Sequence, residues 1–195
     1  MKVTKIVNSQ QIQQAVKILQ QGGIIAYPTE AVYGLGCDPK NIAAIKKILT
    51  LKKREKEKGL ILTGSSLQQF QPFIQKLDNS IKQKLLDSWQ NSDHAITWLV
   101  PAKESTSIYI KGQFNTIAIR VSHHPVVKEL CEHFEGAIIS TSANEAGKDA
   151  ARTQQQVLDA FGSKVNLVVE GETNLAANPS EIRDAISDKI IRSSN

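Results

Sequence analysis

Short apolar segments alternate along this chain with segments in which apolar residues recur at helical spacing. The expected strands are residues 23–27, 59–63, 95–100, 116–121, 136–140, 165–169 and 189–192. The expected helices are residues 10–21, 41–51, 66–70, 80–89, 126–134 and 153–161. This order is typical of a layered α/β fold. Some strands are too close in sequence for crossover connections, so we predict a twisted, mixed sheet with flanking helices.

The chain is long enough to bury a core, and no linker divides it, so we expect one domain over residues 1–195. Its apolar runs, such as residues 24–27, are far shorter than the ~20 residues of a membrane-spanning helix. No apolar signal segment follows Met1. Cys37 and Cys131 match neither a disulfide framework nor a metal-binding spacing, which is typical of reduced thiols. We therefore expect a cytoplasmic protein with no membrane partner.

The net charge of +5 is modestly positive. It fits an anionic substrate, a nucleic acid or both, and does not choose between them. Aromatic residues make up only 5% of the chain, and no basic stripe is interleaved with them. Binding of single strands by base stacking is therefore poorly supported.

Four polar side chains follow the apolar run of residues 137–139, at the end of an expected strand. They are Ser140, Thr141, Ser142 and Asn144. A buried hydroxyl without a partner costs about 1–3 kcal/mol, so a core gives no reason for such a cluster. A capping or turn role can explain Ser142 and Asn144 singly. The four together favour a polar ligand rich in phosphate or carboxylate oxygens.

A second candidate segment follows the strand that ends at Pro28. Thr29 and Glu30 come next, and the chain then reaches Gly34 and Gly36, which we interpret as a turn that lets a ligand approach the backbone closely. The alternative is an ordinary turn in which Thr29 caps a helix. The segment is not a Walker loop, because no Gly-Lys-Ser/Thr sequence closes it.

The basic run of residues 51–59 lies between an expected helix and a buried strand. Lys52 and Arg54 alternate, so in an extended segment they would project the same way and could clamp a polyphosphate. The alternative is a solvated charged face.

Two further candidates have equally plain alternatives. Arg120 is the polar member of an apolar strand. Its guanidinium either binds a carboxylate or a phosphate through two N–H groups, or it simply lies on the surface. Residues 178–184 contain polar groups for a nucleotide, or they begin a helix with Ser180 as its cap.

The four histidines form no catalytic set. No His, Cys or Asp spacing fits zinc, and no Ser-His-Asp or Cys-His arrangement can be assembled. The polar residues are therefore interpreted as binding groups rather than nucleophiles. Phosphoryl or nucleotidyl transfer fits such a site, because it depends mainly on positioning and charge neutralisation.

Five segments, taken together and in order, resemble the YrdC/Sua5 family, and most closely its short bacterial branch, TsaC. They are residues 28–39, Lys52-x-Arg54, 58–62, 140–144 and 178–184. The resemblance implies a basic concave cleft on the mixed sheet, without the C-terminal domain of the longer Sua5 branch. It implies that L-threonine, bicarbonate and ATP give L-threonylcarbamoyladenylate and pyrophosphate, in the first step of tRNA t6A modification. It also implies that Mg²⁺ arrives with ATP, that the protein binds no metal of its own, and that the product passes to the t6A transferase complex (TsaD, TsaB and TsaE).

Position by position, the resemblance implies that Lys52 and Arg54 hold the ATP phosphates and act as the catalytic cations. The other implied ATP contacts are Lys58, Thr97, Ser140, Ser142, Asn144 and Ser180. The implied threonine contacts are Thr29, Arg120 and Thr141. The chain departs from the family where a Pro-Gly-Pro-x-Thr segment is usual, since residues 93–97 keep only the threonine.

Two alternatives remain open. The first is a non-catalytic module of the same fold that binds tRNA or double-stranded RNA. The second is a carbamoyl-transfer relative, as in hydrogenase maturation proteins, although the zinc-finger and acylphosphatase parts of those chains are not found in this sequence.

Overall fold

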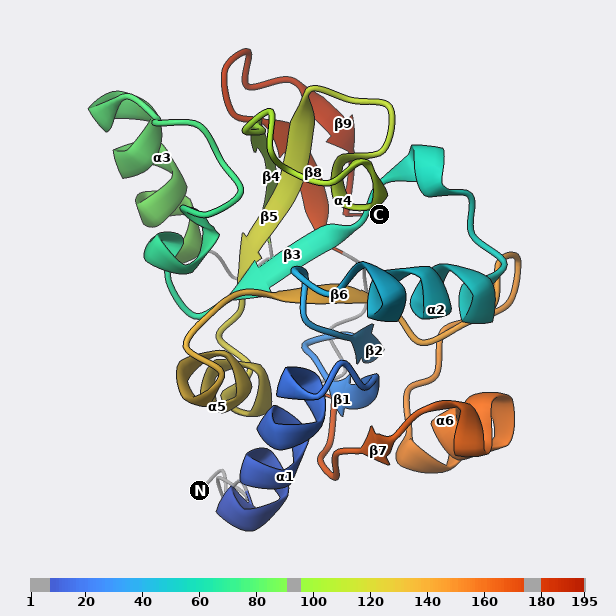
Figure 1. Cartoon of the computed structure of the whole chain (residues 1–195). Helices are drawn as coiled ribbons and strands as arrows, with labels where there is room; N and C mark the ends of the chain where they lie inside the picture. Colours follow the sequence, from blue (N-terminus) through green and yellow to red (C-terminus); the bar gives the residue numbers. More distant parts are fainter. Residues whose placement is uncertain (1–7, 91–95, 174–179, 195) are drawn as a thin grey trace.

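The structure is a computed structural model that describes residues 8–90, 96–173 and 180–194. Within these residues the strands form one nine-stranded sheet in the order β7-β1-β2-β6-β3-β5-β4-β8-β9 (Figure 1). Three neighbouring pairs are parallel, β1 with β7, β3 with β5 and β4 with β8, and the other pairs are antiparallel. The predicted mixed α/β sheet with flanking helices is confirmed.

The strands are β1 (Ile25–Pro28), β2 (Tyr33–Gly36), β3 (Ile61–Gly64), β4 (Ile96–Pro101), β5 (Thr116–Val121), β6 (Ile138–Ser142), β7 (Leu167–Val168), β8 (Glu181–Asp184) and β9 (Ile190–Arg192). The α-helices are α1 (Ser9–Gln20), α2 (Ile42–Lys52), α3 (Asn79–Gln90), α4 (Ile108–Lys111), α5 (Pro125–His133) and α6 (Gln154–Phe161). Short 3₁₀ turns are η1 (Lys56–Lys58), η2 (Leu67–Phe70) and η3 (Gly162–Lys164).

Two predictions of local structure were wrong because pairing between strands decides the conformation there. The expected turn through Gly34 and Gly36 is strand β2, which lies between β1 and β6. The helix start at Ser180, one of the two alternatives for residues 178–184, is the entry to strand β8, which pairs with β4 and β9. Helix α1 begins at Ser9, one residue before the expected helix of residues 10–21, and Asn8 is its N-cap.

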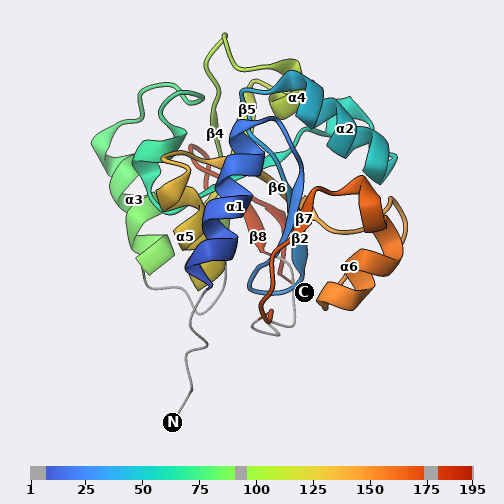
Figure 2. The same ribbon diagram turned by 60° about the horizontal axis from the view of Figure 1, so that its bottom comes forward.

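Different helices cover the two faces of the sheet. Along β1, Ile25 and Tyr27 belong to one apolar cluster and Ala26 to the other, as expected when successive side chains point to opposite faces. The cluster of Tyr27 includes the apolar sides of α1 and α5, which pack side by side (Figures 1 and 2). The other cluster includes buried residues of α2, α3 and α6.

Several polar candidates of the strands lie on the face that carries α1 and α5, which pack on β1 and β3. Ile117 and Ile119 of β5 join the opposite cluster, so Arg120 points to the α1–α5 face. By the same alternation Thr97 of β4 and Ser140 of β6 point to that face. The fold therefore gathers polar side chains from several strands on one side of the sheet.

The two cysteines lie on opposite faces of the sheet, Cys37 in the cluster that includes α2 and Cys131 in the apolar cluster of α1 and α5. Cys37 and Cys131 are free and buried, and burial raises the pKa of the Cys131 thiol to about 12. In the described part of the chain, none of the helices has the length and apolar character required to cross a bilayer.

The glycines of β2 have a packing role that was not predicted, and Gly36→Ala tests it. A Cβ at residue 36 would lie 2.7 Å from Tyr27 Cε1 and 2.8 Å from the carbonyl oxygen of Ile139. Because a buried ring and a backbone must move, we expect the free energy of unfolding to fall by about 1–3 kcal/mol. Gly136→Ala is the control, since its Cβ would meet nothing closer than 3.6 Å. Equal denaturation midpoints for the two variants would contradict this packing.

Candidate functional site

Two groups of polar residues form the candidate site. We call the first the Arg120 cluster, which consists of Glu30, Thr97, Arg120, Ser122, Ser180 and Arg192. We call the second the Lys52 cluster, which consists of Lys52, Arg54, Ser142 and Asn144. Thr63 lies opposite Arg120 and Ile61 lies opposite Ser140, so β3 joins the strands of the two clusters. Paired residues share a face, so Ser140 and Arg120 lie on the same side of the sheet, two strands apart.

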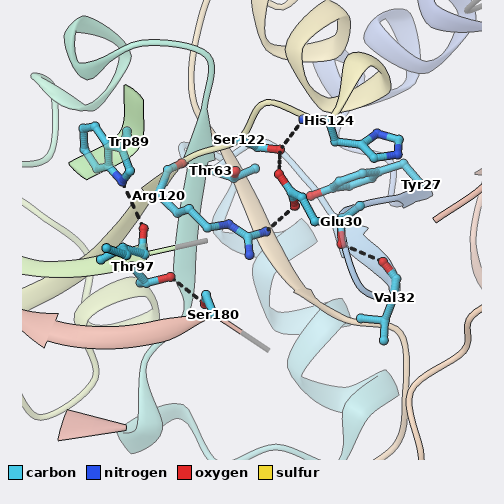
Figure 3. A network of polar contacts seen from close by, with 12 residues as sticks. Tyr27, Glu30, Val32, Thr63, Trp89, Thr97, Arg120, Ser122, His124 and Ser180 are labelled. Atoms are coloured by element: carbon cyan, nitrogen blue, oxygen red, sulfur yellow. Dashed lines mark hydrogen bonds and ion pairs between the residues drawn. The ribbon is translucent and has the colours of Figure 1, made fainter. Parts of the chain in front are cut away.

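Arg120 stands near the end of β5 and makes two contacts with other segments. The Thr63 hydroxyl of β3 donates a hydrogen bond to the Arg120 carbonyl at 3.2 Å. Glu30 comes from the loop between β1 and β2, and its Oε2 lies 3.6 Å from Arg120 Nη2 (Figure 3). Their side chains are only 13% and 19% exposed, so the two charges meet in a largely dry environment.

The Glu30 carboxylate is held in place by the segment that follows β5. The Ser122 hydroxyl donates to Glu30 Oε1 at 2.6 Å, and the backbone N–H of His124 donates to Ser122 Oγ at 3.2 Å. Burial alone would raise the pKa of Glu30, but Arg120 and the Ser122 hydrogen bond lower it below its ordinary value. Glu30 is therefore an anion at neutral pH.

The Arg120 guanidinium retains unused hydrogen-bonding capacity. Its Nε and Glu30 Oε2 are both buried without a hydrogen-bond partner. Glu30 is the one charged partner of Arg120 among the described residues, and 3.6 Å is too long for a hydrogen bond. Buried polar groups are normally paired, so such an arginine is suited to receive a carboxylate or a phosphate.

Thr97 and Ser180 lie beside Arg120 and join β4 to the start of β8. Their hydroxyls are 2.8 Å apart, and both residues are buried (Figure 3). Arg192 of β9 donates from Nη2 to the Ser180 carbonyl at 2.7 Å. Burial and the nearby charge of Arg120 lower the pKa of Arg192. Two guanidinium groups thus share this end of the site, which favours an anionic ligand.

Sequence reasoning assigned no role to Arg192 or Glu30. Arg192 was placed in a late strand, but nothing in the sequence indicated that β9 brings it close enough to Arg120 for their charges to interact. Glu30 was noted next to Thr29, and its partner Ser122 lies 92 residues further along the chain. The Thr29 hydroxyl donates to the Val32 carbonyl at 2.6 Å, so this residue closes a turn and caps no helix.

Lys52 joins the end of α2 to the segment after β6. It is 4% exposed, and its Nζ donates to the Ser142 carbonyl at 2.5 Å, the Asn144 carbonyl at 2.8 Å and Asn144 Oδ1 at 3.1 Å. These contacts use the three N–H bonds of an ammonium group. The Ser142 hydroxyl also donates to Asn144 Oδ1 at 2.6 Å. In this structure Lys52 therefore shapes the turn that carries two predicted ATP contacts.

Arg54 approaches Lys52 by a different geometry from the one expected. An extended segment was predicted, but α2 continues to Lys52 and Lys53 caps it in the left-handed conformation. Arg54 then donates through Nε and Nη2 to the Gly59 carbonyl, at 3.3 and 2.9 Å. Burial lowers the pKa of Arg54, and its charge contributes to the lowered pKa of Lys52. The two cations are close, although they are not alternate residues of a strand.

Other predicted contacts lie apart from these clusters or outside the described residues. Lys58 is exposed and pairs with Glu55 at 3.2 Å. Thr141 alternates with Ser140 and Ser142 along β6, so its side chain points to the opposite face. Ser140 is buried next to the Tyr27 hydroxyl. Residues 93–95 of the altered segment and residues 178 and 179 of the last candidate segment lie outside the described residues.

The titration of Lys52 gives a testable pH dependence. Burial, with a smaller contribution from Arg54, lowers the pKa of Lys52 from 10.5 to about 8. Above this pH the amine loses one N–H, so the turn at Ser142 and Asn144 loosens. We expect kcat/KM for ATP to fall with an apparent pKa near 8 at saturating co-substrate.

Unfolding would not explain such a loss of activity. The unfolded chain keeps the Lys52 proton up to a pH near 10.5, so this residue's contribution to the free energy of unfolding rises from pH 8 to 10.5. In Lys52→Arg, whose guanidinium does not titrate in this range, the alkaline decline should disappear. The same decline in that variant would show that another group causes it.

A protein-bound metal site is not found in the described ranges, where no group of three or more His, Cys, Asp or Glu side chains could hold an ion. The donors that meet in the site are instead guanidinium, ammonium, hydroxyl and amide groups. Such donors bind anions rather than cations.

Comparison with known proteins relates this site to a family. The family model for Sua5, YciO and YrdC proteins, described as telomere recombination, matches residues 17–194. A threonylcarbamoyl-AMP synthase of Photobacterium profundum is 45% identical over 183 residues, which cover 93% of this chain and 97% of the relative. One from Coxiella burnetii is 44% identical over 184 residues, which cover 94% and 97%.

Solved structures agree with this relationship. Sua5 of P. abyssi in complex with L-threonine superposes with a TM-score of 0.84 at 26% identity, covering 92% of this chain and 52% of the other. The chain therefore spans about half the length of that Sua5. E. coli YciO superposes with a TM-score of 0.80 at 23% identity, covering 95% and 90%, and this similarity shows the shared fold.

Proposed function

This chain belongs to the Sua5/YciO/YrdC family, and from that premise we propose that it synthesises L-threonylcarbamoyladenylate. Its substrates are L-threonine, bicarbonate and ATP, its second product is pyrophosphate, and the reaction is a nucleotidyl transfer. Curated relatives of nearly the same length, 42–48% identical, have the name threonylcarbamoyl-AMP synthase, which supports the proposal. The product serves t6A modification of tRNA in the cytoplasm, through hand-off to the t6A transferase complex.

Arg120, with Glu30 beside it, marks the proposed threonine site within the Arg120 cluster. Arg120 pairs with the substrate carboxylate, which gives the unused guanidinium donors a planar acceptor. Thr29 is also assigned to this end. A Sua5 structure with bound L-threonine supports a threonine site in this fold. The largely buried side chain of Arg120, beside Glu30 and on the same sheet face as Ser140, is the observation that carries the proposal.

The Lys52 cluster is the proposed phosphate end of the site. Arg54 supplies charge to the triphosphate, while Lys52 holds Ser142 and Asn144 in position. We retain Lys52, Lys58, Thr97, Ser140 and Ser180 as proposed ATP contacts. For Lys52 to contact a phosphate, a phosphate oxygen must replace one of the three hydrogen-bond acceptors that Lys52 has in this structure. Mg²⁺ enters with ATP as part of the substrate and neutralises charge on the phosphates.

The chemistry follows from the substrates. Neutral threonine amine takes up carbon dioxide derived from bicarbonate and gives a carbamate. A carbamate oxygen attacks the α-phosphorus of ATP, the bond to the bridging oxygen breaks, and pyrophosphate leaves. Arg54 stabilises the charge that develops on the leaving group. Burial of the site protects the short-lived carbamate from water.

Isotope labelling tests the identity of the product. Incubation with ATP, L-threonine and ¹³C-bicarbonate should give an adenylate that contains threonine and one ¹³C atom, detected by mass spectrometry. An adenylate of threonine without the labelled carbon would overturn the proposal. Salt-sensitive tRNA binding without any adenylate would favour the non-catalytic RNA-binding alternative.

A further inference from the structure

We propose that Glu30 is a positioning residue of the threonine site, which acts by holding the Arg120 guanidinium where the substrate carboxylate can reach it. The inference rests on the proposed function and adds a residue to it. Arg120 was identified as a candidate from the sequence, whereas the role of Glu30 emerges from contacts between distant segments.

One carboxylate oxygen of Glu30 is held by a hydrogen bond, and the other faces Arg120. Its Oε1 accepts the 2.6 Å hydrogen bond from Ser122, and Ser122 is in turn held by the backbone N–H of His124. This anchor turns Oε2 toward Arg120 Nη2 (Figure 3). The carboxylate therefore belongs to the wall of the site, between the loop after β1 and the segment after β5.

The distance between the Glu30 carboxylate and the Arg120 guanidinium indicates how Glu30 acts. At 3.6 Å, Glu30 attracts the guanidinium without forming a hydrogen bond to it. A bidentate contact would have used two N–H groups, which a substrate carboxylate would then have to displace. The observed arrangement supplies a counter-charge and leaves the donors for the ligand.

Glu30 also offsets a repulsion at the site. Arg192 lies close enough to Arg120 that the charge of Arg120 lowers the pKa of Arg192. The two guanidinium groups repel each other, and this repulsion would drive Arg120 away if no anion faced it. Glu30 is the anion that faces Arg120 among the described residues. Its loss should therefore free Arg120 to leave the orientation needed for threonine.

Glu30→Gln is the first test, because glutamine keeps an acceptor for Ser122 and removes the charge. We expect KM for L-threonine to rise about tenfold, which corresponds to about 1.4 kcal/mol, and KM for ATP to stay within about twofold. Glu129→Gln is the matched control, since Glu129 pairs with His133 on the exposed side of α5 and should change neither constant. Circular dichroism and the thermal midpoint verify folding.

A double-mutant cycle with Arg120→Ala separates positioning from a merely structural effect. If Glu30 acts through Arg120, adding Glu30→Gln to Arg120→Ala leaves kcat/KM for threonine no lower than Arg120→Ala alone. Ser122→Ala, which loosens the carboxylate and keeps its charge, should raise the threonine KM by less than Glu30→Gln. This variant also provides a test if Glu30→Gln does not fold.

Three results would overturn the role of Glu30: an unchanged threonine KM in Glu30→Gln, an equal rise of both KM values, or additive losses in the cycle. Each of these results refers to conditions in which the wild-type protein forms the adenylate. Failure of the wild type to form the adenylate would instead refute the proposed function itself.

Discussion

Replacement of Arg54 by alanine is expected to reduce adenylate formation by about 10³-fold or more, the scale on which arginines act in phosphoryl transfer. The guanidinium is half-buried just after the end of α2, and its positive charge contributes to the lowered pKa of Lys52. It donates to one backbone carbonyl, that of Gly59, so its removal should cost only about 1 kcal/mol of stability. Pyrophosphate release and a thermal melt measure the two effects separately.

The neighbouring Lys53 provides the control for Arg54. Lys53 is 72% exposed and pairs with Glu145, so Lys53→Ala removes one positive charge from the same turn without reaching the site. We expect near-normal activity for this variant. Retained activity with a normal KM for ATP in Arg54→Ala would show that the phosphate assignment is wrong.

Replacement of Arg120 by alanine is expected to raise KM for L-threonine about 100-fold, since truncating a buried charged partner costs about 2–5 kcal/mol. KM for ATP should change by much less. The reason is that the guanidinium is the proposed partner of the threonine carboxylate, and that Glu30 would be left buried without its counter-charge. Steady-state kinetics with each substrate varied in turn gives the two values.

Two comparisons sharpen the Arg120 test. Arg152→Ala removes an arginine that is exposed before α6 and should leave both constants unchanged. Equal losses for threonine and ATP in Arg120→Ala would indicate that Arg120 serves phosphate instead.

The free energy of unfolding at acid pH gives a further check on the pair. Glu30 has a lowered pKa, so its carboxylate stabilises the fold above its ordinary pKa. That contribution is lost as the pH falls, and it should be absent in Glu30→Gln.

The sequence was sufficient for most of the fold because periodicity was strong where burial decides the structure. The strand expected at 116–121 is β5 with the same bounds. The helix expected at 153–161 is α6, with Thr153 as its cap. Strand β2 was missed because its two glycines suggested a turn, whereas they give space to the Tyr27 ring and the backbone of β6.

The site was predictable only in part, because its geometry depends on contacts between distant segments. The sequence drew attention to Lys52, Arg54 and Arg120, since cations stand out at the ends of elements and on apolar strands. It could not show that Lys52 would use its donors on the Ser142–Asn144 turn. Nor could it show that Glu30 would face Arg120, because the anchor Ser122 comes from a remote loop.

Pyrophosphate release from MgATP, measured with and without L-threonine in bicarbonate buffer, tests directly whether this site uses both substrates. Release is expected to require both threonine and bicarbonate, and to be lost in Arg54→Ala. Release at the same rate without threonine, or no release by the folded wild-type protein, would contradict the central claim that this site joins threonine and ATP.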